Sequence, residues 1–119
     1  MQYLCLVYFE PEVLERMSPE EHRVLNRDSL NYDDALRGGG HYLHSNALDS
    51  VEKAVTVRVR NERMSAMDGP FAETKEHLGG FILIEAENIG EATRLASGIP
   101  LAKLGSIEVR PIYRIEDPR

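Results

Sequence analysis

Thiols are nearly absent from this chain. Cys5 is the single cysteine among 119 residues, so no internal disulfide can form and a reducing cytoplasm is the expected location. Cys5 lies within an apolar run, and no cation next to it in the sequence would lower the pKa of its thiol. A buried, unreactive side chain is therefore expected at this position.

Basic clusters and long apolar segments are absent as well. Asp and Glu number 20 against 14 Lys and Arg, a net charge of −6, and no Lys or Arg block occurs, which argues against a nucleic-acid surface. The longest apolar run, Tyr3–Phe9, is far too short to span a bilayer, and no basic leader for secretion precedes it. No linker or repeat divides the chain, so residues 1–119 are expected to form one domain.

Hydrophobic periodicity predicts alternating strands and helices. Two strands, Tyr3–Phe9 and Phe81–Ala86, are apolar on both faces. Ser18 and Glu21 form a capping box for a helix that runs to about Arg37, where three glycines follow. The other expected elements are strands at 41–46 and 106–113, a hairpin of 54–60 and 63–67 around an Asn61-Glu62 turn, and a second helix from Asn88 to Ile99.

This order, β-α-β-β-(hairpin)-β-α-β, predicts an α+β fold of the ferredoxin-like, split βαβ type with an inserted β-hairpin. Two helices can cover only one face of such a sheet. Because the strands at 3–9 and 81–86 are apolar on both faces, the second face must also be buried. The simplest cover is a second copy of the chain, so a homodimer is expected.

A distinctive segment follows the hairpin. Asp68-Gly69-Pro70-Phe71-Ala72-Glu73-Thr74-Lys75, continued to Phe81, resembles the signature of the DGPF-domain branch of the YCII-related family. The resemblance covers nearly the whole chain. It implies a dimeric α/β-barrel with a small-molecule cleft between sheet and loops, and a functional link to an extracytoplasmic-function (ECF) sigma factor in some members.

The resemblance also implies a histidine–aspartate dyad in the better-understood YCII-type enzymes. By position, Ser29 stands where the helix histidine would be, and Ile99 stands where the aspartate would be. Both members of the dyad are missing, so its chemistry is not carried over to this chain.

The candidate site residues fall into two groups. The expected ligand-binding residues are Ser29, Tyr32, Asp68, Glu73, Thr74, Lys75 and His77, with Ser29 and Tyr32 at the floor of the cleft. Gly69, Pro70 and Phe71 are expected to shape the loop, with Phe71 as an anchor on the core. No catalytic residue is assigned, and no cofactor is expected.

His41 and His44 form an H-x-x-H pair, which raises the question of a metal site. An offset of three along a regular strand places two side chains on opposite faces, so no metal site is expected.

Two hypotheses for function remain open. The first is a non-catalytic, small-molecule-binding or regulatory module that acts beside a sigma factor. The alternative is an isomerase- or lyase-type enzyme for a small anionic substrate, in which Glu73, His77 or His22 is the base and Lys75 stabilises negative charge.

Overall fold

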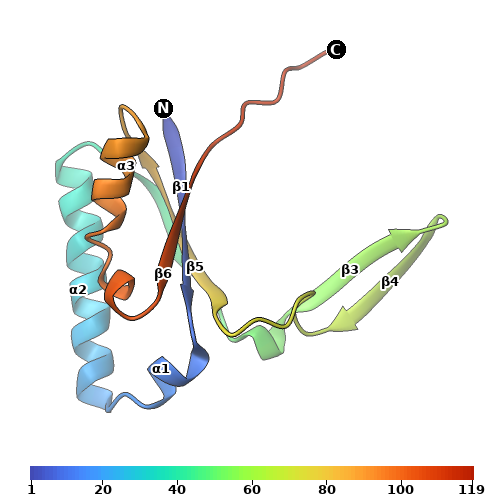
Figure 1. Ribbon diagram of the computed structural model, residues 1–119, viewed down its shortest axis with the longest axis horizontal. Helices are drawn as coiled ribbons and strands as arrows, with labels where there is room; N and C mark the ends of the chain where they lie inside the picture. The colour runs from blue at the N-terminus through green and yellow to red at the C-terminus, as the bar shows by residue number, and fades with distance from the viewer.

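The main sheet holds four antiparallel strands in the order β2-β5-β1-β6. The computed structural model describes residues 1–119, and Figure 1 shows this sheet with its helices on one side. The strands of the sheet are β1 (Gln2–Phe9), β2 (Tyr42–Ala47), β5 (His77–Glu85) and β6 (Ser106–Pro111). The other elements are helices α1 (Pro11–Glu15), α2 (Pro19–Gly38) and α3 (Ile89–Ala96), 3-10 turns η1 (Val51–Lys53) and η2 (Pro100–Lys103), and strands β3 (Val55–Arg60) and β4 (Arg63–Asp68).

The strand order and the single helix layer give a ferredoxin-like α+β fold, as the sequence predicts. Helix α2 follows β1 and helix α3 follows β5, and both lie on the same face of the sheet (Figure 1). The sheet does not close into a barrel within the chain, because β2 and β6 remain at its two edges. The short helix α1 was not anticipated. No helix in the structure combines the length and the apolar character needed to cross a membrane.

The core lies between the sheet and the two long helices. Cys5 of β1 and Ile84 of β5 are fully buried, and they pack with Leu36 of α2 and Ala92 of α3. Cys5 is unpaired, and burial raises the pKa of its thiol to about 11. The expectation of a buried cysteine is therefore confirmed.

Helix α2 begins and ends as predicted. The Ser18 hydroxyl accepts from the Glu21 backbone N–H at 3.1 Å, and the Glu21 carboxylate accepts from the Ser18 N–H at 3.0 Å. These hydrogen bonds lower the pKa of Glu21. At the other end Gly39 is the C-cap, and Gly40 follows with a φ of 78°.

The face of the sheet away from the helices carries a continuous apolar band. Its six side chains form three cross-strand pairs between β1 and β5, and all of them are half-buried in the single chain. The pairs are Leu4 with Leu83, Leu6 with Phe81, and Tyr8 with Leu78. Exposed polar side chains of the outer strands border this band: His44 and Asn46 on β2, and Glu108 and Arg110 on β6. We call this surface the open face.

Strands β3 and β4 form a two-stranded ribbon, the arm, which projects away from the helices (Figure 1). Asn61 and Glu62 at its tip have φ values of 51° and 64°, which fits the predicted tight turn of type I′. One face carries a row of large apolar side chains that are more than half exposed, and the other face carries three arginines together with Met67. The apolar face carries Val55, Val57, Val59 and Met64, and the basic face carries Arg58, Arg60 and Arg63.

A bulge in β2 changes which side chains share a face. The register of β2 against β5 shifts between Tyr42 and His44, so Tyr42 and Ser45 both lie on the helix side, opposite Ile84 and Ile82. The strict alternation assumed for this strand is therefore wrong, because the extra residue reverses it.

Candidate functional site

A cleft of about 510 Å³ opens between α2, β2, β5 and η2 on the helix side of the sheet. We call it the α2–β2 cleft. Its apolar wall includes Val7, Ile82 and Leu101, and its polar lining comes mainly from α2 and β2. The volume lies within the range of about 300–1,000 Å³ that is typical of small-molecule sites.

Ser29 and Ile99 both line this cleft. They come from different elements, Ser29 from α2 and Ile99 from the segment before η2, and the fold brings them to one cavity. Ile99 is buried, whereas Ser29 is half-buried and its hydroxyl makes no hydrogen bond within the protein. The two positions that the family resemblance links to a dyad thus share one site, although neither holds a titratable group.

Tyr32 forms part of the wall of the cleft. Its hydroxyl donates to the Leu95 carbonyl at 2.5 Å, which ties α2 to α3. Burial, followed by the proximity of Cys5, raises the pKa of Tyr32. Tyr32 lies in the cleft as predicted, but its polar group is engaged by the protein itself.

Three polar side chains form a hydrogen-bonded chain beside the cleft: Asp33 and Ser45 belong to its lining, and Tyr42 lies outside it. The Tyr42 hydroxyl lies 2.7 Å from the Ser45 hydroxyl, and Ser45 donates to Asp33 Oδ2 at 3.3 Å. The β2 bulge makes this possible, since it puts Tyr42 and Ser45 on the same face. Burial raises the pKa of Asp33, against the opposing effects of the Ser45 hydrogen bond and Arg37.

The sequence analysis did not identify this series of hydrogen-bonded side chains, Tyr42, Ser45 and Asp33. Asp33 lies one helical turn beyond Ser29, so the i, i+4 relation could have placed it in the same cleft. No comparable signal pointed to Ser45, because its orientation depends on the bulge.

The residues that line the cleft include no lysine, arginine or histidine. Arg37 of α2 acts electrostatically on Asp33, pairs with Asp34 at 2.7 Å and lies over the Tyr42 ring at 4.1 Å. It stays outside the lining.

The Asp68–His77 segment lies elsewhere. Thr74 and His77, together with Pro70 and Phe71, line a wide hollow of about 970 Å³ at the base of the arm, bordered by Tyr8 of the open face. Lys75 is 84% exposed and pairs with Glu10 at 3.5 Å. Asp68 and Glu73 are exposed and belong to neither cavity. Of the predicted ligand-binding residues, the structure therefore places two in the α2–β2 cleft and two in this hollow, and it leaves Asp68, Glu73 and Lys75 outside both.

Hydrogen bonds hold the base of the arm together. Gly69 has a φ of 97°, as its position in the turn predicts, and its N–H donates to the Ala54 carbonyl at 2.7 Å. Thr56 donates to the Gly69 carbonyl at 2.9 Å. Thr74 donates to the Glu76 carbonyl at 2.6 Å, which gives this hydroxyl a structural role. Phe71 corrects the sequence analysis: it is 77% exposed and does not pack on the core of its own chain.

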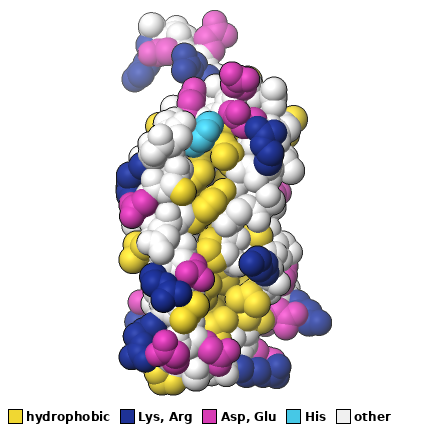
Figure 2. All heavy atoms as spheres, turned by 90° about the vertical axis from the view of Figure 1, so that its left-hand side faces the viewer, with side chains coloured by type: hydrophobic (Ala, Val, Ile, Leu, Met, Phe, Trp, Pro, Cys, Tyr) yellow, Lys and Arg dark blue, Asp and Glu magenta, His cyan; other side chains and the backbone are white.

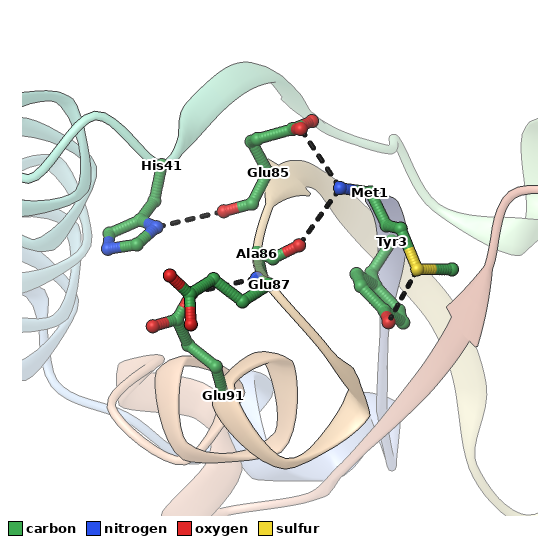
Figure 3. A network of polar contacts seen from close by, with 7 residues as sticks. All are labelled: Met1, Tyr3, His41, Glu85, Ala86, Glu87 and Glu91. Atoms are coloured by element: carbon green, nitrogen blue, oxygen red, sulfur yellow. Dashed lines mark hydrogen bonds and ion pairs between the residues drawn. The ribbon is translucent and has the colours of Figure 1, made fainter.

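A further polar cluster joins the start of β1 to the end of β5 (Figure 3). The Met1 amino group donates to the Glu85 carboxylate and to the Ala86 carbonyl, each at 3.0 Å. His41 Nδ1 lies 2.8 Å from the Glu85 carbonyl, whereas the His44 ring contacts that of Phe81. No group of three potential metal ligands forms here or elsewhere in the chain.

A shallow groove of about 650 Å³ runs between α2 and η2, and Figure 2 shows apolar side chains along this side of the molecule between charged ones. Its rim includes Glu20, Glu21 and Asp28 from α2, with Lys103 opposite. His22, a candidate base, lines neither this groove nor the α2–β2 cleft.

Two comparisons relate this chain to known proteins. The family model described as the YCII-related domain matches residues 1–116. An uncharacterised protein of Rhizobium meliloti (strain 1021) is 35% identical over 114 residues, which cover 94% of this chain and 92% of that protein.

Proposed function

The chain belongs to the YCII-related domain family, and on that premise we propose that it is a homodimer that binds a small molecule in the α2–β2 cleft. The observation that carries the proposal is the meeting of Ser29 and Ile99 in one cavity of suitable size. The unpartnered hydroxyl of Ser29 offers a ligand a hydrogen bond that the protein itself does not use.

Two features support the homodimer. The open face presents three apolar cross-strand pairs that the single chain leaves only half-buried. The arm exposes Val55, Val57, Val59 and Met64, and an isolated two-stranded ribbon is only marginally stable in water. The radius of gyration is 16.6 Å, against about 13.5 Å for a compact domain of this length. A second copy on the open face, held by the arms, would bury these surfaces and place the two sheets face to face, as in a dimeric α/β-barrel.

A ligand screen tests the cleft. A panel of metabolites is assayed by thermal shift, since a compound that binds only the folded protein raises the melting temperature. Ser29→Phe should fill the cleft and abolish the shift. Asn31→Phe is the matched control, because Asn31 lies on the same helix but lines the groove rather than the cleft. A ligand that binds Ser29→Phe as well as the wild type would contradict the assignment.

The narrower DGPF assignment, the cytoplasmic location and a regulatory role beside an ECF sigma factor stay predictions from the sequence. The alternative of an isomerase or lyase for an anion gains no support from the position of Lys75, which pairs with Glu10 away from the cleft. We therefore favour a binding role, without an assigned reaction.

A further inference from the structure

The lining of the α2–β2 cleft carries negative charge and no positive charge. Asp33 is the only acidic residue in the lining, and no lysine, arginine or histidine accompanies it. Sites for carboxylates or phosphates generally supply Arg, Lys or a row of backbone N–H groups. This cleft offers an anion no ion pair, and α2 begins at Pro19, well before Ser29. The four-residue 3-10 turn η2 reaches the cleft with its first residues, but it starts at Pro100, which has no N–H to donate.

A cation is not readily supplied from nearby. Arg37 is held by Asp34 on one side and by the Tyr42 ring on the other. Arg27 lies next to Asp28, at 3.5 Å, and is absent from the lining. The proposed partner copy would cover the open face, which shares only the uncharged Phe81 and Asn46 with the cleft lining. Asp33, the charged residue of the lining, lies on α2 at the helix side of the sheet.

The hydrogen bonds among Tyr42, Ser45 and Asp33 all run in the same direction. Because Ser45 donates to Asp33, its oxygen is left to accept, and the Tyr42 hydroxyl donates to it. The donors therefore point along the chain towards Asp33, which ends it as an acceptor. Only Oδ2 of Asp33 is engaged by Ser45, so the carboxyl group retains acceptor capacity for a ligand.

From this arrangement we propose that the ligand of the cleft carries no negative charge and donates an N–H or O–H to Asp33. The apolar wall of Val7, Ile82 and Leu101 takes the rest of the molecule. Small amines, amides and alcohols with a compact apolar body fit this description, and carboxylates and phosphates do not. The proposal rests on the proposed function of the cleft and specifies its ligand class, which differs from the anionic substrate expected from the sequence.

Matched probes test the charge preference. Benzylamine, benzamide and benzoate have the same ring and differ in charge, and cyclohexylmethylamine, cyclohexanecarboxamide and cyclohexanecarboxylate repeat the series. Each is titrated near neutral pH into ¹⁵N-labelled protein, and the amide resonances of Ser29, Asp33 and Ser45 report binding in the cleft. The amines and amides should bind there with dissociation constants at least about tenfold below those of the carboxylates, a difference of about 1.4 kcal/mol.

Two variants tie the preference to one side chain. Asp33→Asn removes the negative charge but keeps the shape, and it should abolish the advantage of the amines over the carboxylates. Asp28→Asn, on the same helix but in the groove, should leave the order of affinities unchanged.

The possible outcomes separate the two proposals. Carboxylates that bind in the cleft as tightly as amines and amides, or a preference that survives Asp33→Asn, would overturn the ligand class alone. If no probe moves the cleft resonances even at millimolar concentration, the proposed function of the cleft fails, and the ligand class fails with it.

Discussion

Gly98 offers a sharp test of how the cleft wall is built. A Cβ atom at this position would lie 2.4 Å from the hydroxyl oxygen of Tyr32, 2.5 Å from Cζ and 2.6 Å from Cε1. Ordinary contacts between heavy atoms are about 3.5–4.0 Å, so Gly98→Ala requires the tyrosine ring to move by about 1 Å. The hydroxyl would then lose its hydrogen bond to the Leu95 carbonyl.

The expected cost combines two effects. Overpacking costs about 1–3 kcal/mol, and a lost hydrogen bond costs about 0.5–1.5 kcal/mol, so Gly98→Ala should destabilise the protein by about 1.5–4.5 kcal/mol. For a domain of this size, the melting temperature falls by about 4 °C per kcal/mol. A fall of about 6–18 °C is therefore expected in calorimetry at fixed protein concentration.

Two controls isolate the clash. A Cβ at Gly38, the last residue of α2, would meet nothing within 4 Å, so Gly38→Ala should be neutral or stabilising by up to about 1 kcal/mol. In a Tyr32→Ala background the clash disappears, and Gly98→Ala should then cost little. The explanation is refuted if Gly98→Ala has the same melting temperature as the wild type. It is also refuted if Gly98→Ala lowers the melting temperature by the same amount in the Tyr32→Ala background.

Three further predictions address the interface, the polar chain and the arm. Leu6→Asp on the open face should be monomeric in light scattering, whereas the control Glu108→Lys at the border should stay dimeric. A folded wild-type monomer at micromolar concentration would rule out the proposed dimer. The pKa of Asp33 is raised in the folded protein, so its protonated form stabilises the fold. This stabilisation is fully present below the ordinary aspartate pKa of about 3.9, and it is lost as pH rises through the raised pKa. As pH rises through this window, the melting temperature of Asp33→Asn should therefore increase relative to that of the wild type. A difference in melting temperature that does not change with pH would contradict this prediction. Gly69→Val should destabilise by about 1–3 kcal/mol because φ is 97°, and denaturant unfolding with wild-type stability would show that the backbone relaxes there.

Local signals in the sequence predicted most of the fold. The capping box at Ser18 and the turn at Asn61 depend on residues close together in the chain, and both were placed correctly. The strand order followed from the succession of elements and from the rule that two helices cover one face. Ser29 and Tyr32 line one cleft, because their spacing on α2 sets their common face, and their role in ligand binding stays a prediction.

What the sequence did not reveal depends on distant pairings. The bulge at Leu43 exists only because β2 aligns with β5, and a shift of one residue exchanges the two faces of a strand. Ser45 could not be assigned to the cleft without that register. The anchoring role expected for Phe71 assumed that an aromatic residue after a tight corner would turn inward, whereas it stays exposed beside the arm.

The same bulge also bears on how the protein avoids aggregation. Strand β2 is an outer strand of the sheet, and a regular outer strand is a template for pairing with other chains. The shifted register interrupts the row of free backbone groups, and the exposed His44 and Asn46 follow it. At the opposite edge β6 ends in Pro111, which has no N–H to donate. Growth of the sheet by strand addition is thus obstructed at both edges, and β-sheet fibrils should nucleate more readily in variants that restore a regular β2.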